Sequence, residues 1–251
     1  MKNSKIRIIF DGIIAPFVIS FLITVTVSAV YVLITHDLDP NLILVQGIAS
    51  VFVFAALYPL YMMFKKKYEI KTKDFMFSVC LYMIPLAFSI CVIGNVAVDY
   101  IPRVTENAVT MEVYKLAEEY NVFLSLFLVS VVIPIVEELM FRGFFYDTVK
   151  ILSNDLLAII FTSIAFAVAH FEIRQSIYAL FAGLFLAYIK YKYRRLIYTI
   201  ILHLLMNLTT LVFVPTVLSV NDIRNRAYIL FVTIAILLIS LYRINYKKNI
   251  S

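Results

Sequence analysis

Runs of apolar residues follow one another along almost the whole chain, and they constrain its fold more than any other feature. A helix needs about 20 mostly apolar residues to cross the hydrocarbon core of a bilayer. Of the 251 residues, 63% are hydrophobic and 15% are charged, whereas soluble domains average about 45–50% apolar and about 25% charged residues. The sequence therefore predicts an all-α, polytopic helical bundle surrounded by lipid.

The predicted organisation is a single membrane domain over residues 1–251, because no long polar stretch interrupts the apolar runs. The first run is too long for a cleaved signal peptide, so we expect it to remain as an anchor. The fifth and sixth runs are short and closely joined, which suggests a shallow hairpin. About eight transmembrane helices are predicted, at residues 13–35, 42–64, 75–98, 122–145, 156–171, 176–189, 196–218 and 228–241.

The distribution of charge predicts the orientation. Eight crossings place both termini on one side, and most of the 22 basic residues fall on that side. Because Lys and Arg are enriched in short cytoplasmic loops, we expect both termini in the cytoplasm. The net charge of +6 could also indicate nucleic-acid binding, but the basic residues cluster between apolar runs. That pattern favours membrane topology and predicts no nucleic-acid partner.

Two further features concern single segments. In the longest connection, residues 99–120, the apolar Val109, Val113 and Leu116 recur at helical spacing. The connection is therefore either a short amphipathic helix on the membrane surface or a solvated link.

Cys80 and Cys91 share one apolar run and would lie about 16 Å apart on a helix, too far for a mutual disulfide.

Two adjacent acidic residues, Glu137 and Glu138, lie inside a predicted span, whereas every other acidic residue is assigned to a loop. A charge deep in a span costs about 2.5–3.5 kcal/mol. On a helix, Glu138 and Arg142 share a face, while Glu137 is turned about 100° from Glu138. We expect Arg142 to hold Glu138 ionised and Glu137 to point into a cavity. Alternatively, both glutamates pair with Arg142 or reach the cytoplasmic interface.

Two of the three histidines also occupy apolar surroundings, and only His36 lies in a polar loop. His203 and Asn207 are one helical turn apart on one face, and His170 ends an apolar run. Any one of these residues could serve helix packing, but their joint presence with Glu137 gives four reactive or hydrogen-bonding groups in a medium where each is costly. The candidate catalytic residues are Glu137, His170, His203 and Asn207, with Glu138 and Arg142 in support.

One distance complicates this convergence. Counted from Leu156, His170 lies about 21 Å along its helix, whereas His203 lies about 10 Å along its own. The fifth span must therefore start earlier, tilt, or be sunk within the membrane.

Three short motifs resemble those of the CPBP family of membrane proteins, which contains type II CAAX prenyl endopeptidases and bacteriocin-processing or self-immunity (Abi) proteins. The resemblance covers residues 121–211, the expected catalytic core, and leaves 1–120 as N-terminal transmembrane helices. The motifs are Glu137-Glu138-Leu-Met-Phe-Arg142 (E-E-x-x-x-R), Phe166-Ala-Val-Ala-His170 (F-x-x-x-H) and His203-Leu-Leu-Met-Asn207 (H-x-x-x-N), with Gly183 in a compatible place.

The resemblance implies a glutamate-dependent intramembrane endopeptidase that needs no cofactor. Glu137 would activate a water molecule, and His170 would help to hold or deprotonate it. His203 and Asn207 would stabilise the oxyanion, while the neighbouring Glu–Arg pair would orient the site. The implied partner is a membrane-associated peptide or protein substrate.

The composition bears on the substrate. The chain has five Gly, no Trp and many Tyr, and it is rich in Ile, Lys and Asn, which suggests an AT-rich bacterial source. Prenylated CAAX proteins are not expected there, and no segment resembles a prenyl-binding signature. We therefore expect a leader peptide, a bacteriocin or a signalling-peptide precursor as substrate, in a bacterial plasma membrane.

Three rival functions stay open at this point. One Glu and two His can hold a catalytic zinc ion, although no H-E-x-x-H helix is present. A non-catalytic immunity or scaffold protein could use the same fold to bind a bacteriocin or a membrane partner. Ion-coupled transporters also bury Glu and His, but no repeat or broken helix pair is visible here. The sequence does not show the oligomeric state.

Overall fold

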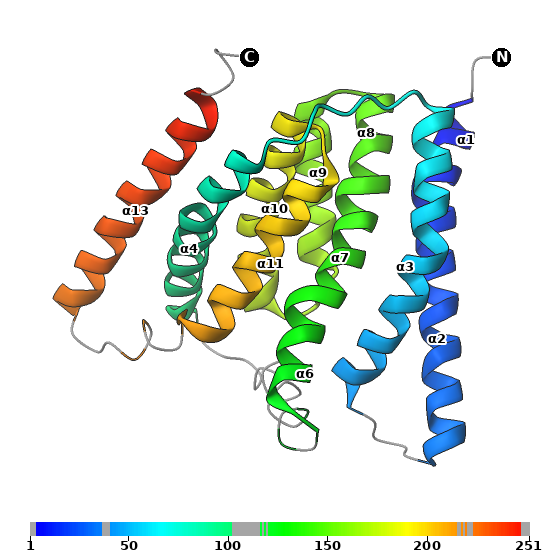
Figure 1. Ribbon diagram of the computed structural model, residues 1–251, viewed down its shortest axis with the longest axis horizontal. Coiled ribbons are helices and arrows are strands. Elements are labelled where there is room, and N and C mark those ends of the chain that lie inside the picture. Colours follow the sequence, from blue (N-terminus) through cyan, green and yellow to red (C-terminus); the bar gives the residue numbers. More distant parts are fainter. Residues whose placement is uncertain are drawn as a thin grey trace.

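The computed structural model describes residues 4–36, 41–101, 116, 118, 120–214, 217, 219 and 223–246. Their regular structure is entirely helical and forms eight continuous rods that run alternately up and down (Figure 1). Each of the eight predicted spans overlaps with one rod, although several of their ends differ. The all-α, polytopic prediction is therefore confirmed for the described part of the chain.

Two of the rods contain π-helical turns (η). The first rod is α1 (Lys5–Ile9), η1 (Phe10–Ile14) and α2 (Ala15–Thr35), and the fourth is α6 (Val122–Phe127), η2 (Leu128–Val132), α7 (Ile133–Glu138), η3 (Leu139–Phe145) and α8 (Tyr146–Leu152). The others are α3 (Leu42–Lys67), α4 (Phe77–Asp99), α9 (Asp155–Val168), α10 (Ile173–Tyr193), α11 (Leu196–Val212) and α13 (Ile223–Tyr246).

Five stretches within these rods are long and apolar enough to cross a membrane: Lys5–Thr35, Ile43–Lys67, Phe77–Asp99, Val122–Leu152 and Arg224–Asn245. Helices α9 and α11 are apolar but shorter, and α10 carries two lysines in its last turn. The chain is thus an integral, multi-pass membrane protein.

Asparagine side chains fix the start of three helices. Asn41, Asn121 and Asn154 each accept a hydrogen bond from a backbone N–H in the first turn of α3, α6 and α9, which satisfies a donor that the helix itself leaves unpaired. At the opposite ends, α3 and α10 finish with lysines, which suit the negative end of the helix dipole.

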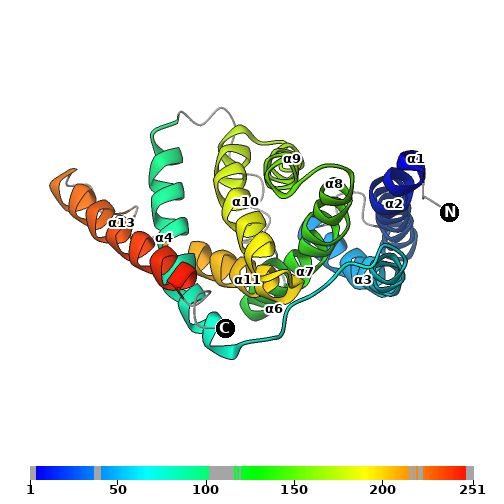
Figure 2. The same cartoon turned by 90° about the horizontal axis from the view of Figure 1, so that it is seen from above.

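The centre of the bundle is built from α4, α7, α10 and α11, with α9 beside α10 (Figure 2). The first rod and α3 form one edge, and α13 packs against α4 at the other. One cluster of buried apolar side chains joins α3, α4, α7, η3, α9, α10, α11 and α13. Glu138 on α7 and Arg142 on η3 therefore face a protein interior.

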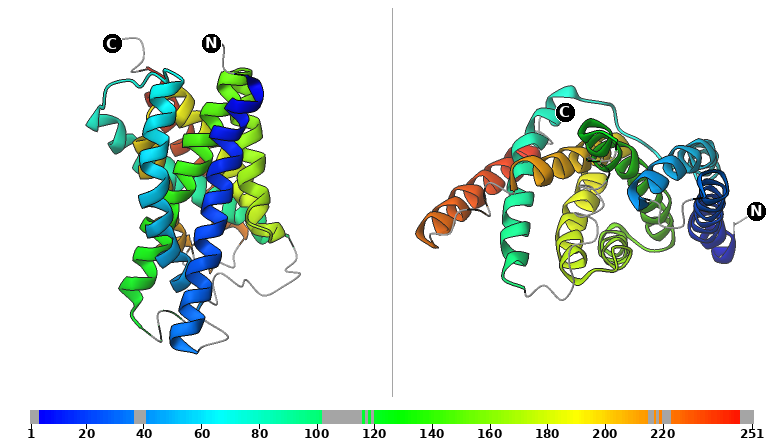
Figure 3. Two further views of the ribbon diagram at one scale, coloured as in Figure 1. Left: turned by 90° about the vertical axis from the view of Figure 1, so that its right-hand side faces the viewer. Right: turned by 90° about the horizontal axis from the view of Figure 1, so that it is seen from below.

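The two described ends of the chain, α1 and the last turn of α13, lie at the same end of the bundle (Figure 3). The final turns of α3, α8 and α10, which carry basic residues, lie at that end too. The segments that the charge pattern assigned to one side thus lie together.

Helices α9 and α10 form a hairpin, as predicted, but only α9 is short. Helix α10 has 21 residues and is longer than the predicted run of residues 176–189, and the turn also differs from the prediction. Helix α9 has 14 residues, about 21 Å, which is shorter than the roughly 30 Å hydrocarbon core. It ends at Val168, so His170 lies in the turn and not on the helix. Phe171 takes a left-handed conformation (φ 56°), and Glu172 caps α10 by accepting from two backbone N–H groups at 3.0 and 2.6 Å.

The assignment of every other acidic residue to a loop was wrong for Asp147, which lies in α8 with an exposed fraction of 2%. Cys80 and Cys91 both lie on α4 and are unpaired, as expected. The predicted surface helix with Val109 and Val113 falls outside the described residues. Leu116 is described and is fully buried.

Candidate active site

A buried ion pair lies within the fourth rod, and its arginine also contacts the α9–α10 hairpin. Arg142 Nη1 donates to Glu138 Oε1 at 3.0 Å, and both side chains are fully buried. Arg142 Nη2 donates to the Gly183 carbonyl at 3.3 Å, and the guanidinium carbon lies 4.2 Å from the centre of the Phe166 ring. A buried ion pair is stable only with such additional partners. The predicted pairing of Arg142 with Glu138 is thus present in the structure.

Gly183 is the residue on α10 that makes room for this arginine. A Cβ atom at this position would lie 3.2 Å from Arg142 Nη2 and 3.3 Å from the backbone Cα of Ser163. Both contacts are closer than ordinary packing, and the second involves backbone that cannot swing aside. The close approach of α9, α10 and the guanidinium therefore depends on a residue without a side chain.

His203 lies between the two glutamates. Its Nδ1 is 2.9 Å from Glu138 Oε1, and because an ionised carboxylate only accepts, Nδ1 carries the proton. The other ring nitrogen, Nε2, faces Glu137 Oε2 at 3.7 Å, which is longer than a hydrogen bond. His203 is therefore fixed on one side and turned toward Glu137 on the other.

Glu137 and Glu138 have different surroundings although they are neighbours in sequence. The side chain of Glu137 is 26% exposed, whereas that of Glu138 is fully buried. The helical turn between successive residues separates the two carboxylates. This difference agrees with the expected pairing of Glu138. Glu137 is partly exposed, but it does not line the cavity described below, so its predicted place in a cavity stays a prediction.

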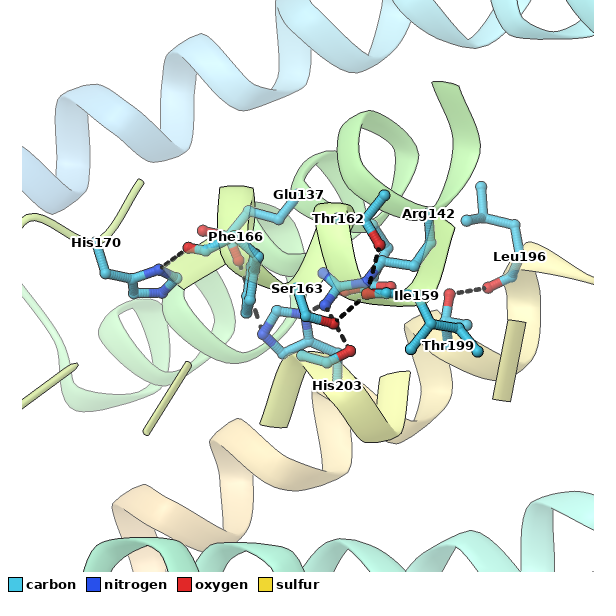
Figure 4. A network of polar contacts seen from close by, with 12 residues as sticks. Glu137, Arg142, Ile159, Thr162, Ser163, Phe166, His170, Leu196, Thr199 and His203 are labelled. Atoms are coloured by element: carbon cyan, nitrogen blue, oxygen red, sulfur yellow. Dashed lines mark hydrogen bonds and ion pairs between the residues drawn. The ribbon is translucent and has the colours of Figure 1, made fainter. Parts of the chain in front are cut away.

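The Phe166 ring joins the two histidines (Figure 4). Its centre lies 4.7 Å from the His170 ring and 5.6 Å from the His203 ring, with the rings nearly perpendicular in both cases. His170 Nδ1 also lies 2.8 Å from the Phe166 carbonyl oxygen, which can only accept, so Nε2 of this ring keeps its lone pair. Phe166 thus links His170 to His203. The F-x-x-x-H spacing alone did not reveal this role of Phe166.

Asn207 donates a hydrogen bond to the backbone carbonyl of Val129, which has no backbone partner in the fourth rod. In the π-turn η2 the Ile133 N–H bonds to Leu128, so in the same register Val129 would need an N–H from residue 134. That residue is Pro134, which has none. Asn207 Nδ2 instead donates to the Val129 carbonyl at 3.0 Å. This contact holds α11 against η2 beside the glutamates, a placement typical of π-turns near functional sites.

A cavity of about 370 Å³ opens next to this contact, between the α6–η2 stretch and α11. Its walls are apolar apart from Ser130, whose hydroxyl is buried and has no hydrogen-bond partner among the described residues. An apolar segment of a ligand would fit such a surface.

A second buried polar cluster was missed by the sequence reasoning. Lys190 Nζ lies 3.0 Å from Asp147 Oδ2, and the Tyr61 hydroxyl donates to the same oxygen at 2.8 Å. Both charged side chains are 3% exposed. The available signal was that residues 146–152 continue the helical pattern of the preceding span, which would have drawn Asp147 into the bundle.

Within the described ranges, no group of three His, Cys, Asp or Glu side chains is placed to hold a metal ion. Glu138, which could have been a ligand, already accepts from both Arg142 and His203.

The fold and the site together define a class of protein. It is a multi-pass membrane protein with glutamate, histidine and arginine side chains gathered between its helices. Residues 119–209, which include every candidate site residue, match the family model described as type II CAAX prenyl endopeptidase Rce1-like. This part of the chain is an Rce1-like domain of the CPBP/Abi family. No curated protein and no solved structure matches the chain.

Proposed function

We propose that the chain is an intramembrane endopeptidase in which Glu137 activates a water molecule. The observation that carries the proposal is the 3.7 Å separation of Glu137 Oε2 and His203 Nε2 within a domain of an endopeptidase family. A water molecule about 2.8 Å from each atom fits this separation. Glu138 and Arg142 hold the His203 ring in place from the opposite side.

The reaction is the hydrolysis of a peptide bond. Glu137 takes a proton from the water, and the hydroxide oxygen forms a bond to the scissile carbonyl carbon. Asn207, and His203 in the form that carries a proton on Nε2 as well as on Nδ1, donate to the negatively charged carbonyl oxygen, and Nε2 of His170 helps to hold the water. The carbon–nitrogen bond then breaks, and the proton passes from Glu137 to the leaving nitrogen. The products are a carboxylic acid and an amine.

The substrate is a membrane-associated peptide or protein precursor, such as a leader peptide, a bacteriocin or a signalling peptide. The apolar cavity between η2 and α11 supports this choice because it lies next to Asn207 and suits an apolar stretch of such a peptide. The chain crosses a bacterial plasma membrane eight times with both termini in the cytoplasm. The gathering of basic helix ends at one end of the bundle supports that orientation.

The test compares the wild type with Glu137→Gln, which keeps size but removes the base. Both are brought to equal membrane abundance, and cleavage of a co-expressed peptide precursor is followed by mass spectrometry. Since a general base contributes about 10²- to 10⁴-fold, the variant should lose at least 100-fold in rate. Glu69→Gln makes the same chemical change at an exposed position and should cleave normally.

Two results would contradict this proposal. Wild-type cleavage by Glu137→Gln would show that Glu137 is not the base, and a non-catalytic immunity or scaffold role would then take over. Loss of wild-type cleavage in EDTA, restored by zinc, would favour the zinc alternative.

A further inference from the structure

The apolar cavity between the α6–η2 stretch and α11 contains one polar group that the proposed hydrolysis leaves unused. Ser130 lies in η2 and lines this cavity. The residue is 4% exposed, and its hydroxyl has no hydrogen-bond partner among the described residues. Because a buried hydroxyl without a partner is costly, its place in the wall of a cavity indicates a ligand that carries a matching polar atom.

Ser130 differs from other buried hydroxyl groups of the bundle. Ser89, Thr162 and Ser240 donate to the carbonyl four residues earlier, at 2.8, 2.7 and 2.7 Å, as Ser and Thr commonly do inside helices. Ser125, in the same rod, makes this bond at 3.2 Å. Ser130 lies in a π-turn, where the helical register changes from four residues to five, and its hydroxyl stays available.

The other buried hydroxyl without a partner in the described part of the chain belongs to Thr148 on α8. It lies against the first rod, where a Cβ atom on Gly12 would come within 1.8 Å of it, so there is no space for a ligand between these rods. Ser130 instead faces a cavity of about 370 Å³. Of these two hydroxyl groups, only that of Ser130 therefore combines a missing partner with room for one.

The other lining residues select an apolar occupant. Two of them, Phe127 and Leu208, are 54% and 44% exposed, so the cavity lies at the lipid-facing side of the bundle. The acyl chain of a lipid has no polar atom for Ser130, and a helical segment already pairs its own backbone groups. An extended apolar peptide has both apolar side chains and backbone carbonyls in need of a donor. The apolar lining residues are Leu126, Phe127, Val131, Leu204, Leu205 and Leu208.

The position of Ser130 fits a peptide that also reaches Glu137. Ser130 precedes Glu137 by seven residues, about 10 Å along the rod, and an extended peptide covers about 3.3 Å per residue. On α11, Leu208 directly follows Asn207, which the proposed hydrolysis places at the carbonyl oxygen. Since the fourth rod runs toward the end of the bundle that carries both termini (Figure 1), the peptide would extend from Glu137 toward the opposite end.

We propose that Ser130 donates a hydrogen bond to a backbone carbonyl of an extended, apolar substrate segment, about three residues from the scissile bond. The cavity takes the apolar side chains of this segment. The assignment rests on the proposed function and deepens it, because it names a residue that determines specificity and the form in which the substrate binds. Ser130 takes no part in the chemistry, so its loss should weaken binding and leave kcat unchanged.

Binding can be measured without hydrolysis. The full chain with Glu137→Gln is placed in phosphatidylcholine nanodiscs with a synthetic alanine–leucine peptide that carries one photoreactive leucine. Labelling is followed against peptide concentration, and the labelled residues are located by mass spectrometry. Ser130→Ala removes the hydroxyl, and Leu205→Phe fills part of the cavity. Ser125→Ala removes a hydroxyl that bonds within its own helix and serves as the matched control.

The peptide should label the cavity walls on η2 and α11, equally with and without Ser125→Ala. Ser130→Ala should raise the peptide concentration for half-maximal labelling about two- to tenfold, the effect of one hydrogen bond, and should leave the thermal midpoint unchanged because its hydroxyl bonds nothing in the described protein. Leu205→Phe should remove most of the labelling. Unchanged labelling in Ser130→Ala, or a lower thermal midpoint with unchanged labelling, would overturn the proposal.

A photoreactive phosphatidylcholine tests the competing occupant. If it labels the same walls and the peptide does not displace it, the cavity is filled by lipid and the proposal fails. Because labelling needs no hydrolysis, its result is separate from the test of Glu137. Labelling that depends on Ser130, together with normal cleavage by Glu137→Gln, would refute the catalytic role of Glu137 and still support the binding site.

Discussion

His203 Nδ1 lies 2.9 Å from Glu138 Oε1, the same oxygen that accepts the hydrogen bond from Arg142. One carboxylate oxygen therefore orients a histidine on α11 and balances a buried arginine on its own rod. This leaves the ring nitrogen Nε2 of His203 facing Glu137. The two adjacent glutamates thus divide into one that holds the site together and one that is accessible for chemistry.

Replacing His203 with asparagine separates these two roles. The Asn side chain can still donate to Glu138 from the position of Nδ1, but it has no group at the position of Nε2. We expect His203→Asn to keep wild-type abundance and thermal stability while kcat falls about 100- to 1000-fold, the usual effect of losing an oxyanion donor. His203→Gln, which restores a donor near Nε2, should recover part of the rate. An unchanged kcat in His203→Asn would remove His203 from the chemistry.

Asn207 is expected to stabilise the contact between α11 and η2. An aspartate at this position has no donor for the Val129 carbonyl, and its carboxylate oxygen would face the carbonyl oxygen, so that two acceptors repel each other. Asn207→Asp should therefore lower the free energy of unfolding by about 1–3 kcal/mol, measured as the thermal midpoint in detergent. Adding Pro134→Ala supplies the missing backbone N–H and should restore part of the loss. If Pro134→Ala gives no recovery, the π-turn account of this contact is wrong.

Gly183 should not tolerate even a methyl group. Gly183→Ala would press on the Ser163 backbone and on Arg142, so we expect a loss of about 1–3 kcal/mol, as for other overpacked sites. Gly143→Ala is the matched control, because its Cβ would meet only side-chain atoms, at 3.3 Å or more. The thermal midpoints of the two variants in one detergent give the comparison. Equal midpoints would show that α9 and α10 can move apart.

The parts of the fold that depend on local sequence were predictable. The apolar runs located all eight rods, and the four-residue spacing of Glu138 and Arg142 placed them on one face, because helical geometry fixes both. The separation of Glu137 from Glu138 followed from the same geometry. These features need no knowledge of how the helices pack.

The parts that depend on packing between distant segments were not predictable. Glu138 and His203 are 65 residues apart, so the spacing along the chain carries no information about their contact. The Val129–Asn207 hydrogen bond depends on a π-turn that shifts the register of one rod, and hydrophobic periodicity does not show such a shift. His170 was expected on a helix, but α9 ends at Val168 and Glu172 caps the start of α10, so His170 lies in the turn between the two helices.

The buried pair of Asp147 and Lys190 offers a test of packing away from the site. Asp147 lies ten residues after Glu137, about 15 Å along the rod, so changes there should leave cleavage intact. Removing one partner leaves an uncompensated buried charge, which costs about 3–5 kcal/mol.

We therefore expect Asp147→Asn and Lys190→Met to lower the thermal midpoint strongly when made singly. The double variant removes both charges and should recover most of the loss, because a well-packed neutral pair is often as stable as a buried ion pair. Precursor cleavage by the double variant should match the wild type at equal abundance. If the two losses simply add, the charges do not stabilise each other. If cleavage falls while stability recovers, the cluster of Tyr61, Asp147 and Lys190 positions the site from a distance.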